Sequence, residues 1–88
     1  MGQKTQFYIE MTDTFSGEAN YCWVNRFIVT ASSFTGAIRK VTRETGYSAR
    51  CTGNYGDSRS YDVPKAAICY FAEYADSFHE NQSNIKYL

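Results

Sequence analysis

The stretch Arg26–Tyr47, RFIVTASSFTGAIRKVTRETGY, decides the fold of this chain. It opens with aromatic and β-branched residues, which are typical of a strand. Ser32 or Ser33 can then accept from the free N–H groups at the start of a helix, and Gly46 suits the left-handed residue that ends one. Between these caps the apolar residues recur at i, i+3, i+4 and i+7, the spacing of one helix face: Phe34, Ala37, Ile38 and Val41. The stretch therefore predicts a strand that runs directly into an amphipathic helix over residues 33–45.

Alternating patterns on both sides of this stretch predict a sheet. Gln6–Met11 alternates apolar and polar residues, as a strand with one buried face does. Tyr21–Ala31 has the composition of a second strand, which we expect to be antiparallel to the first across the intervening loop. After the helix, residues 48–52 and 58–63 can pair on either side of the turn-rich stretch Gly53–Ser60. We therefore expect the helix to pack on one face of an antiparallel sheet.

Residues 65–78 fit two different structures. As a helix, they would present an apolar stripe after Pro64, formed by Ala67, Ile68, Phe71, Tyr74, Ala75 and Phe78. As a strand, residues 66–74 would be a mostly apolar run suited to the middle of a sheet. The strand is favoured because bulky Cys69 and Tyr70 lie opposite the helical stripe, and the helix is the alternative.

The expected architecture is a single small α+β domain over residues 1–88, in the order β-β-α-β-β. It is a three- or four-stranded antiparallel sheet with the 33–45 helix on one face. Residues 1–5 and 76–88 are expected at its periphery, the latter as a polar tail with a small anchor from Ile85, Tyr87 and Leu88. The predicted core consists of Trp23, Phe27, Phe34, Ile38, Val41, Ile68 and Phe71.

The composition limits the classes of function. A chain of 88 residues gives one domain, and nine basic residues balance nine acidic ones. This balance excludes an acidic mimic of DNA and a chain that binds DNA by bulk charge. Basic residues prevail from Trp23 to Gly56 and acidic ones from Asp57 to Ile85, so the folded molecule can be polarised. Three cysteines, no apolar leader and no apolar run long enough for a membrane span indicate a soluble cytoplasmic protein.

Neither a metal site nor a catalytic site is expected. Cys22, Cys51, Cys69 and His79 are residue types that bind zinc, but no two of them are spaced as a chelating pair. The sequence contains no nucleophile elbow and no phosphate-binding loop. We therefore expect no cofactor, no metal and no enzymatic activity.

Two stretches carry the candidate binding residues. On the helix, a cationic face lies opposite the apolar stripe; the alternative is an ordinary solvated face with a Lys40–Glu44 pair. Beyond the helix, residues 46–61 (GYSARCTGNYGDSRSY) combine tyrosine with serine, glycine, asparagine and arginine, as antibody paratopes do. The alternative for this stretch is a hairpin whose tyrosines pack on the sheet edge. The predicted partner-binding residues are Arg39, Lys40, Arg43, Tyr47, Tyr55, Arg59 and Tyr61.

The strand that runs into VTASSFTGAIRKV (residues 29–41) resembles small phage-encoded accessory proteins, including anti-CRISPR proteins and inhibitors of host polymerases. The resemblance implies an antiparallel sheet with one helix, no catalytic residues, and action by blocking a surface of a larger nucleic-acid-processing complex. We therefore expect a non-enzymatic, protein-binding inhibitor or modulator of a host protein or ribonucleoprotein complex. The alternative is a weak binder of single-stranded nucleic acid that uses the helix and hairpin cations with tyrosine stacking. A homodimer is compatible with either function.

Overall fold

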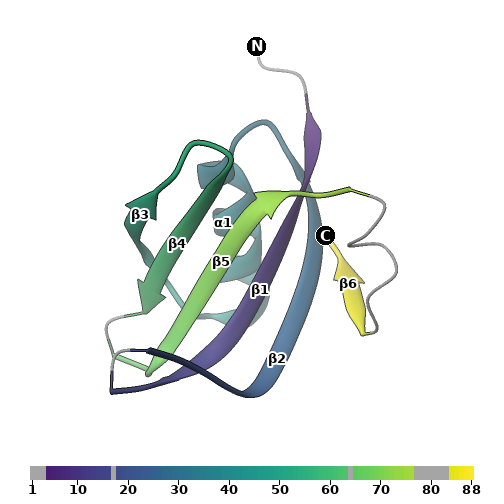
Figure 1. Cartoon of the computed structure of the whole chain (residues 1–88). Coiled ribbons are helices and arrows are strands. Elements are labelled where there is room, and N and C mark those ends of the chain that lie inside the picture. The colour runs from purple at the N-terminus through teal and green to yellow at the C-terminus, as the bar shows by residue number, and fades with distance from the viewer. Residues whose placement is uncertain (1–3, 17, 64, 77–83) are drawn as a thin grey trace.

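One six-stranded mixed sheet and one helix form the structure, a computed structural model that describes residues 4–16, 18–63, 65–76 and 84–88. The strands lie across the sheet in the order β3-β4-β5-β1-β2-β6, and every neighbouring pair is antiparallel except β2 and β6. In chain order the elements are β1 (Thr5–Phe15), β2 (Glu18–Ala31), α1 (Phe34–Thr45), β3 (Arg50–Asn54), β4 (Ser58–Val63), β5 (Ile68–Tyr74) and β6 (Ile85–Tyr87) (Figure 1).

The predicted α+β class with one helix on one face of the sheet is confirmed. The predicted sheet of three or four antiparallel strands is matched only in part, because the sheet has six strands and one of its pairs is parallel. Within residues 65–78, Ile68–Tyr74 forms β5, so the strand interpretation of residues 66–74 is confirmed for most of its length; residues 77 and 78 lie outside the described residues. β5 pairs with β1 on one side and β4 on the other, which places its apolar run inside the sheet. The parallel strand β6 was not expected, because three residues carry no periodicity of their own. The order is therefore β-β-α-β-β-β-β.

The helix is capped at both ends as its sequence predicts. At the start, the Oγ atom of Ser33 accepts a hydrogen bond from the backbone N–H of Gly36 at 3.1 Å. At the end, Gly46 has a left-handed backbone with φ of 81°, and its N–H donates to the carbonyl of Thr42 at 2.7 Å. These bonds satisfy backbone groups that the helix itself leaves unpaired. The boundaries of α1 are thus set by local chemistry.

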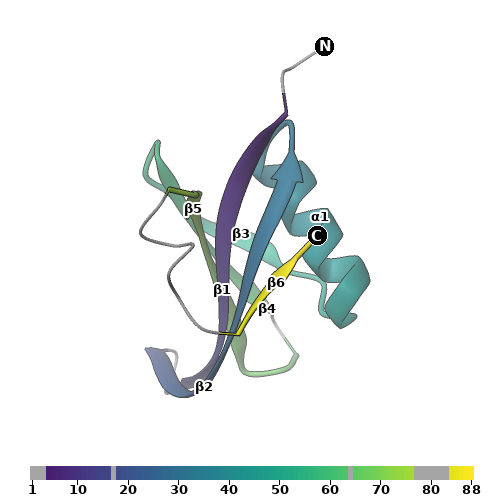
Figure 2. The ribbon, with the colours of Figure 1, turned by 90° about the vertical axis from the view of Figure 1, so that its right-hand side faces the viewer.

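The core lies between α1 and one face of the sheet, here called the covered face (Figure 2). Alternate residues of β1 point into it, and the ring of Phe7 packs on that of Phe34 with centroids 4.7 Å apart. The hydroxyl of Tyr70 is also buried there, 2.9 Å from Oγ1 of Thr45 and donating to the carbonyl of Tyr47 at 3.0 Å. A buried hydroxyl with partners avoids the cost of an unsatisfied polar group. The covered face is therefore both apolar and internally hydrogen-bonded.

The predicted core is correct for the residues of α1 and for Phe27 and Ile68, which are buried. Trp23 was predicted to be buried and is 39% exposed. The physical reason is a register shift opposite Asp13, whose carboxylate accepts from the N–H of Cys22 at 2.9 Å and from the amide of Asn20 at 2.8 Å. Trp23 lies within this irregular stretch, between the paired residues Ala19 and Val24 of β2. Phe71, also predicted in the core, lies on the opposite face of the sheet and is partly exposed.

The described end of the chain, residues 84–88, lies along β2. The N–H of Leu88 donates to the carbonyl of Ile28 at 2.9 Å, and the carbonyl of Leu88 accepts from the N–H of Thr30 at 3.1 Å. Of the predicted anchor, the Leu88 side chain packs against the core, whereas Tyr87 is 61% exposed. Lys86 forms an ion pair with Glu44 of α1. Residues 77–83 of the predicted tail, including His79, lie outside the described residues.

Candidate interaction surface on the open face of the sheet

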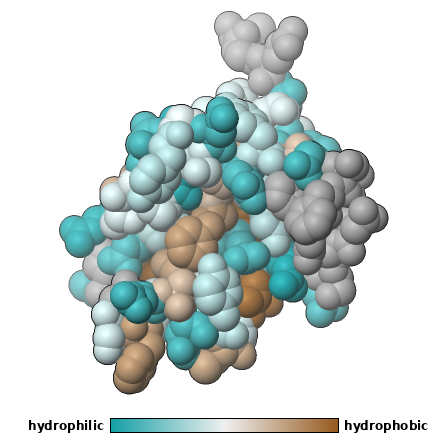
Figure 3. Space-filling model, viewed as in Figure 1, coloured by the Kyte–Doolittle hydropathy of each residue, from teal (hydrophilic) through white to brown (hydrophobic). Residues whose placement is uncertain are grey.

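The second face of the sheet, here called the open face, is the one turned away from α1. Strand alternation produces it: Phe7, Ile9 and Met11 point to the helix, so Tyr8 and Glu10 between them point to the open face. No helix of the part of the chain that the structure describes packs on this face (Figures 1 and 2). Figure 3 shows apolar side chains gathered at its centre among polar ones. A sheet face with an apolar centre that no described helix covers is a candidate for binding.

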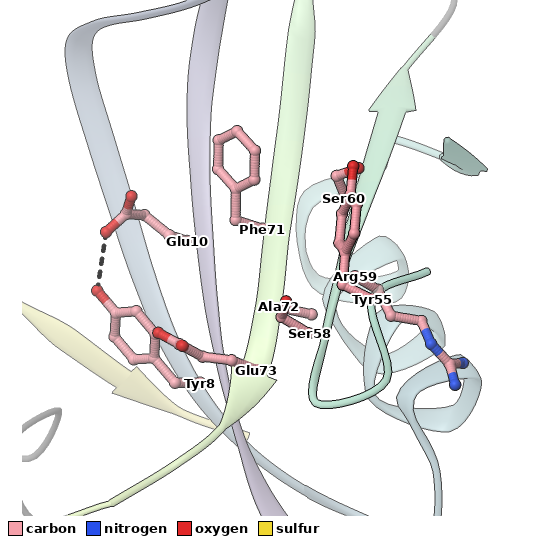
Figure 4. A pocket seen from close by; sticks show the side chains of 9 residues that line it. All are labelled: Tyr8, Glu10, Tyr55, Ser58, Arg59, Ser60, Phe71, Ala72 and Glu73. Atoms are coloured by element: carbon pink, nitrogen blue, oxygen red, sulfur yellow. Dashed lines mark hydrogen bonds between the residues drawn. The ribbon is translucent and has the colours of Figure 1, made fainter. Parts of the chain in front are cut away.

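A groove crosses the open face. Its first part, of about 270 Å³, is lined by Tyr8, Glu10, Tyr55, Ser58, Arg59, Ser60, Phe71, Ala72 and Glu73 (Figure 4). A second hollow of about 360 Å³ is lined by Thr14, Ala19, Thr52, Ser60, Tyr61, Asp62, Cys69 and Phe71. Because both contain Ser60 and Phe71, the two hollows adjoin at these residues. We call them together the open-face groove.

Aromatic rings form the centre and one wall of the open-face groove. Phe71 is stacked with Tyr21 of β2, with ring centroids 6.5 Å apart and an interplanar angle of 15°. Tyr55, in the turn between β3 and β4, is 71% exposed. Its ring lies across Gly53: a Cβ atom there would be 2.6 Å from Cζ of Tyr55 and 2.7 Å from Oγ of Ser60. Only a glycine at residue 53 allows this placement of Tyr55.

The charged groups that line the open-face groove are mainly acidic. Glu10, Asp62 and Glu73 line it from β1, β4 and β5. Arg59 is the one basic residue among the described residues that line the groove, and its guanidinium lies 4.7 Å from the centroid of the Phe34 ring, on the side of α1. Figure 4 shows this guanidinium directed away from Glu10. The groove therefore favours cationic groups over anionic ones.

Tyr8 reports the electrostatic character of this face. Its hydroxyl donates to a carboxylate oxygen of Glu10 at 3.0 Å. Burial, together with the hydrogen bond and the negative charge of Glu10, raises the pKa of Tyr8 to about 12, against a smaller lowering effect of Arg26. Arg26 stands opposite Glu10 on β2. A phenol held neutral beside a carboxylate is a hydrogen-bonding group rather than a general base at neutral pH.

The predicted cationic residues of the helix occupy a different place. Arg39 and Arg43 line a groove of about 550 Å³ between α1 and the β3–β4 hairpin, together with Thr35, Ile38, Thr42, Ser48, Ala49, Cys51 and Tyr61. We call it the helix-side groove. Tyr61, predicted to contact a partner, is only 6% exposed because it alternates toward the covered face with Val63. The structure thus brings Arg39, Arg43 and Tyr61 together, with the tyrosine largely buried.

The other predicted binding residues are dispersed. Lys40 donates to the carbonyl of Thr30 at 2.6 Å, and Glu44 pairs with Lys86, so the alternative Lys40–Glu44 pair is not formed. Tyr47 is partly exposed beside the end of α1 and offers its carbonyl to Tyr70. Tyr55 lies on the open-face groove, whereas the Arg59 guanidinium lies on the other side of the sheet. The predicted residues therefore do not make one continuous surface.

Sequence reasoning missed the residues that form most of the open-face groove, namely Tyr8, Glu10, Asp62 and Glu73, and misassigned Phe71 to the core. The signal was present in the alternation of β1, where Phe7, Ile9 and Met11 face inward. The same parity argument applied to β5 separates buried Tyr70 from Phe71. Alternation predicts both faces of a strand, not only the buried one.

The cysteines lie on three different strands. Cys22 and Cys51 are exposed and Cys69 is buried. Burial, with the nearby charges of Asp62, Asp13 and Glu10, raises the pKa of Cys69 and so favours its thiol over the thiolate that binds metals. No group of histidine, cysteine and acidic residues suited to a metal ion occurs among the described residues, which do not include His79. The absence of a metal stays a prediction.

Comparison with known proteins gave no significant match to a protein family, to a curated protein or to a solved structure. Within the described ranges, no helix is both long and apolar enough to cross a membrane.

Proposed function

We propose that the protein is a non-enzymatic protein-binding domain that modulates or inhibits a larger host complex, and that it binds its partner with the open-face groove. The observation that carries this proposal is the exposed aromatic centre of a sheet face that no described helix covers. Tyr21 is 53% exposed and Tyr55 is 71% exposed, and both border the partly exposed ring of Phe71. Exposed aromatic side chains around a hollow are the usual anchors of protein interfaces.

The way in which the groove is built also supports binding. Its floor belongs to β1, β4 and β5, which pair along their lengths. A surface held by strands is largely ordered before a partner arrives, so less conformational entropy is lost on association. That the partner belongs to a nucleic-acid-processing complex rests on the resemblance of residues 29–41 to phage accessory proteins.

Binding of single-stranded nucleic acid is the second candidate, and the helix-side groove favours it. Arg39 and Arg43 make no ion pair within the described residues, so their charge is available to phosphates. Single-strand binders, however, place cations and stacking aromatic rings on one surface. In this molecule the exposed rings of Tyr21 and Tyr55 border the acidic groove, away from these arginines. This separation ranks nucleic acid below protein as a partner.

The salt dependence of oligonucleotide binding tests the second candidate. If phosphates are the ligand, affinity for a single-stranded oligonucleotide should fall steeply with salt, and Arg39→Gln and Arg43→Gln should each flatten the logarithmic slope by about one unit. Tight binding at physiological salt with that response would place nucleic acid first. We expect weak binding with little response to either substitution.

Site-specific crosslinking tests the proposed function. A photoreactive phenylalanine derivative replaces Tyr21 or Tyr55 in the full chain, expressed in cells of the host. The matched control carries it at Thr35, an exposed position of α1. We expect one and the same protein to crosslink from residues 21 and 55 and not from residue 35. Unlabelled wild-type protein should suppress the product, and Phe71→Ala should suppress it far less.

Two results would contradict the proposal. Crosslinking from residue 35 alone would place the partner on the helix side. Equal suppression by wild type and by Phe71→Ala, with the variant shown to be folded by circular dichroism, would show that the open-face groove does not hold the partner.

A further inference from the structure

We propose that the open-face groove binds an extended, arginine-bearing segment of the partner protein. This inference rests on the proposed function and adds the chemistry of the occupant. Its basis is the combination, within one groove, of carboxylates from β1 and β4 with a stacked aromatic centre.

Charge complementarity selects a cationic occupant. Glu10 stands opposite Phe71 in the strand register, at the residue that the two parts of the groove share, and Asp62 lies opposite Cys69, two residues away along β5. No lysine is among the described residues that line either part. Arg26 and Arg50 stand opposite Glu10 and Asp62 in the strand register, and neither forms an ion pair with them in the described part of the chain. These carboxylates can therefore pair with a charge supplied from outside. A phosphate backbone would meet repulsion at the same positions.

The aromatic centre favours arginine over lysine. Phe71 and Tyr21 present nearly parallel rings, and Phe71 lines both parts of the groove. A planar guanidinium stacks on such rings and at the same time donates to a carboxylate through two parallel N–H groups. An ammonium group offers the charge without the flat surface. Arginine therefore uses both chemical features of the groove.

The dimensions favour an extended segment. Along β1, the lining residues run from Tyr8 to Thr14, a distance of roughly 20 Å at about 3.3 Å per residue of a strand. An extended peptide of about six residues covers that length, with alternate side chains directed to the groove. Two arginines spaced by one residue can then reach Phe71 with Glu10 beside it and, two residues away along β5, the carboxylate of Asp62.

Peptide binding tests the inference. The probe is a fluorescein-labelled Arg-Gly-Arg-Gly-Arg peptide, compared with its lysine and glutamate counterparts by fluorescence anisotropy at 50 and 150 mM salt. We expect saturable binding of the arginine peptide, at least about threefold weaker binding of the lysine peptide, and none of the glutamate peptide. The double variant Glu10→Gln/Asp62→Asn should weaken binding about tenfold. It removes two ion pairs with peptide arginines, each of which contributes somewhat less than about 1 kcal/mol.

Two further variants complete the design. Phe71→Leu keeps an apolar side chain of similar volume and removes the ring, so it should weaken the arginine peptide about threefold to fivefold while the domain stays folded. Glu44→Gln is the control: like each of the two groove substitutions it removes one negative charge, but it does so on α1, away from the groove. Its affinity for the arginine peptide should stay within about twofold of wild type.

Several outcomes would overturn the inference. These are no binding of the arginine peptide, an equal loss with Glu44→Gln, or no preference for arginine together with a silent Phe71→Leu. Tighter binding of a thymidine oligonucleotide after the carboxylates are removed would assign the groove to nucleic acid. A doubling of molecular mass with concentration, lost in Phe71→Leu, would assign it to a second copy of this chain.

The two proposals fail separately. A protein crosslinked from residues 21 and 55 without any affinity for the arginine peptide overturns the chemistry inferred here and leaves the proposed function intact. Specific binding of the arginine peptide without a crosslinked protein supports the chemistry of the groove and counts against the proposed function.

Discussion

The two faces of the sheet are made by the same strands and differ in almost every physical respect. On the covered face, Phe7, Val29 and Tyr70 are fully buried under α1. On the open face, their neighbours in sequence include the carboxylates of Glu10 and Glu73 and the partly exposed ring of Phe71. The difference shows that an aromatic residue in a strand has no fixed place: its parity decides whether it packs in the core under α1 or lies on the open face.

The sharpest test of this comparison is a pair of identical substitutions. Phe7→Ala removes a fully buried ring and should lower the free energy of unfolding by about 3–5 kcal/mol, because it leaves a cavity. Phe71→Ala removes a partly exposed ring and should cost about 1 kcal/mol. Denaturant unfolding followed by circular dichroism measures both. Equal losses would mean that Phe71 belongs to the core and would break the distinction between the faces.

The hairpin tip offers the next largest effect, on binding rather than folding. Tyr55→Ala should weaken partner binding by about 2 kcal/mol, as expected for an exposed aromatic anchor, and hardly change thermal stability. Gly53→Ala should weaken the same binding although residue 55 remains tyrosine, because the new methyl group would displace the Tyr55 ring. The measurement is a binding titration of each variant against the purified partner that the crosslinking experiment identifies. A silent Gly53→Ala beside a damaging Tyr55→Ala would show that the placement of the ring does not matter.

At a second glycine, Gly36 of α1, substitution by alanine should be favourable and should stabilise the fold. A Cβ atom at Gly36 of α1 would lie 3.5 Å from Oγ of Ser33 and 3.6 Å from Cβ of Ala31, which are ordinary contacts. The packing of α1 on the sheet therefore does not require a glycine at this residue. Gly36→Ala should raise the free energy of unfolding by about 0.5–1 kcal/mol, since alanine favours the helix. A loss of stability in thermal unfolding would mean that the covered face is packed more tightly.

The smallest effect at neutral pH concerns Tyr8. Its pKa of about 12 lies above the ordinary value of 10.0 because of burial and the neighbouring Glu10, so folding favours the protonated phenol. This contribution is fully present below pH 10 and is lost as the pH rises through 12. The stability difference between wild type and Tyr8→Phe should therefore shrink over this range, as unfolding titrations at several pH values can measure. A constant difference would place Tyr8 in a solvent-like environment.

The parts of the fold that follow from short-range chemistry could be predicted from the sequence. Ser33, the apolar stripe of α1 and Gly46 act within a few residues of one another, and all are correct. β6 could not be predicted, because its pairing joins Arg26 to Ile85 across most of the chain. Trp23 was misplaced for a similar reason: the bonds that Asp13 makes to the opposite strand, and not the pattern of β2, interrupt the alternation.

The candidate site was less predictable than the fold. The sequence draws attention to the cations of α1 and to the tyrosines of residues 46–61, since these are unusual in composition. Whether Tyr61 is a contact residue or a core residue depends on which face of β4 it occupies, and composition does not contain that information. The acidic groove arises only when β1, β4 and β5 lie side by side.

The short strand β6 protects the sheet from its own edge. β6 pairs with Arg26–Ile28 of β2, and Leu88 extends the backbone hydrogen bonds as far as Thr30. These residues of β2 belong to the most β-prone segment of the chain, and an exposed strand of that kind is a template for pairing with other chains. When residues 84–88 detach, self-association through β2 becomes the competing reaction. The five residues 84–88 therefore occupy backbone groups of β2 that would otherwise be open to pairing with another chain.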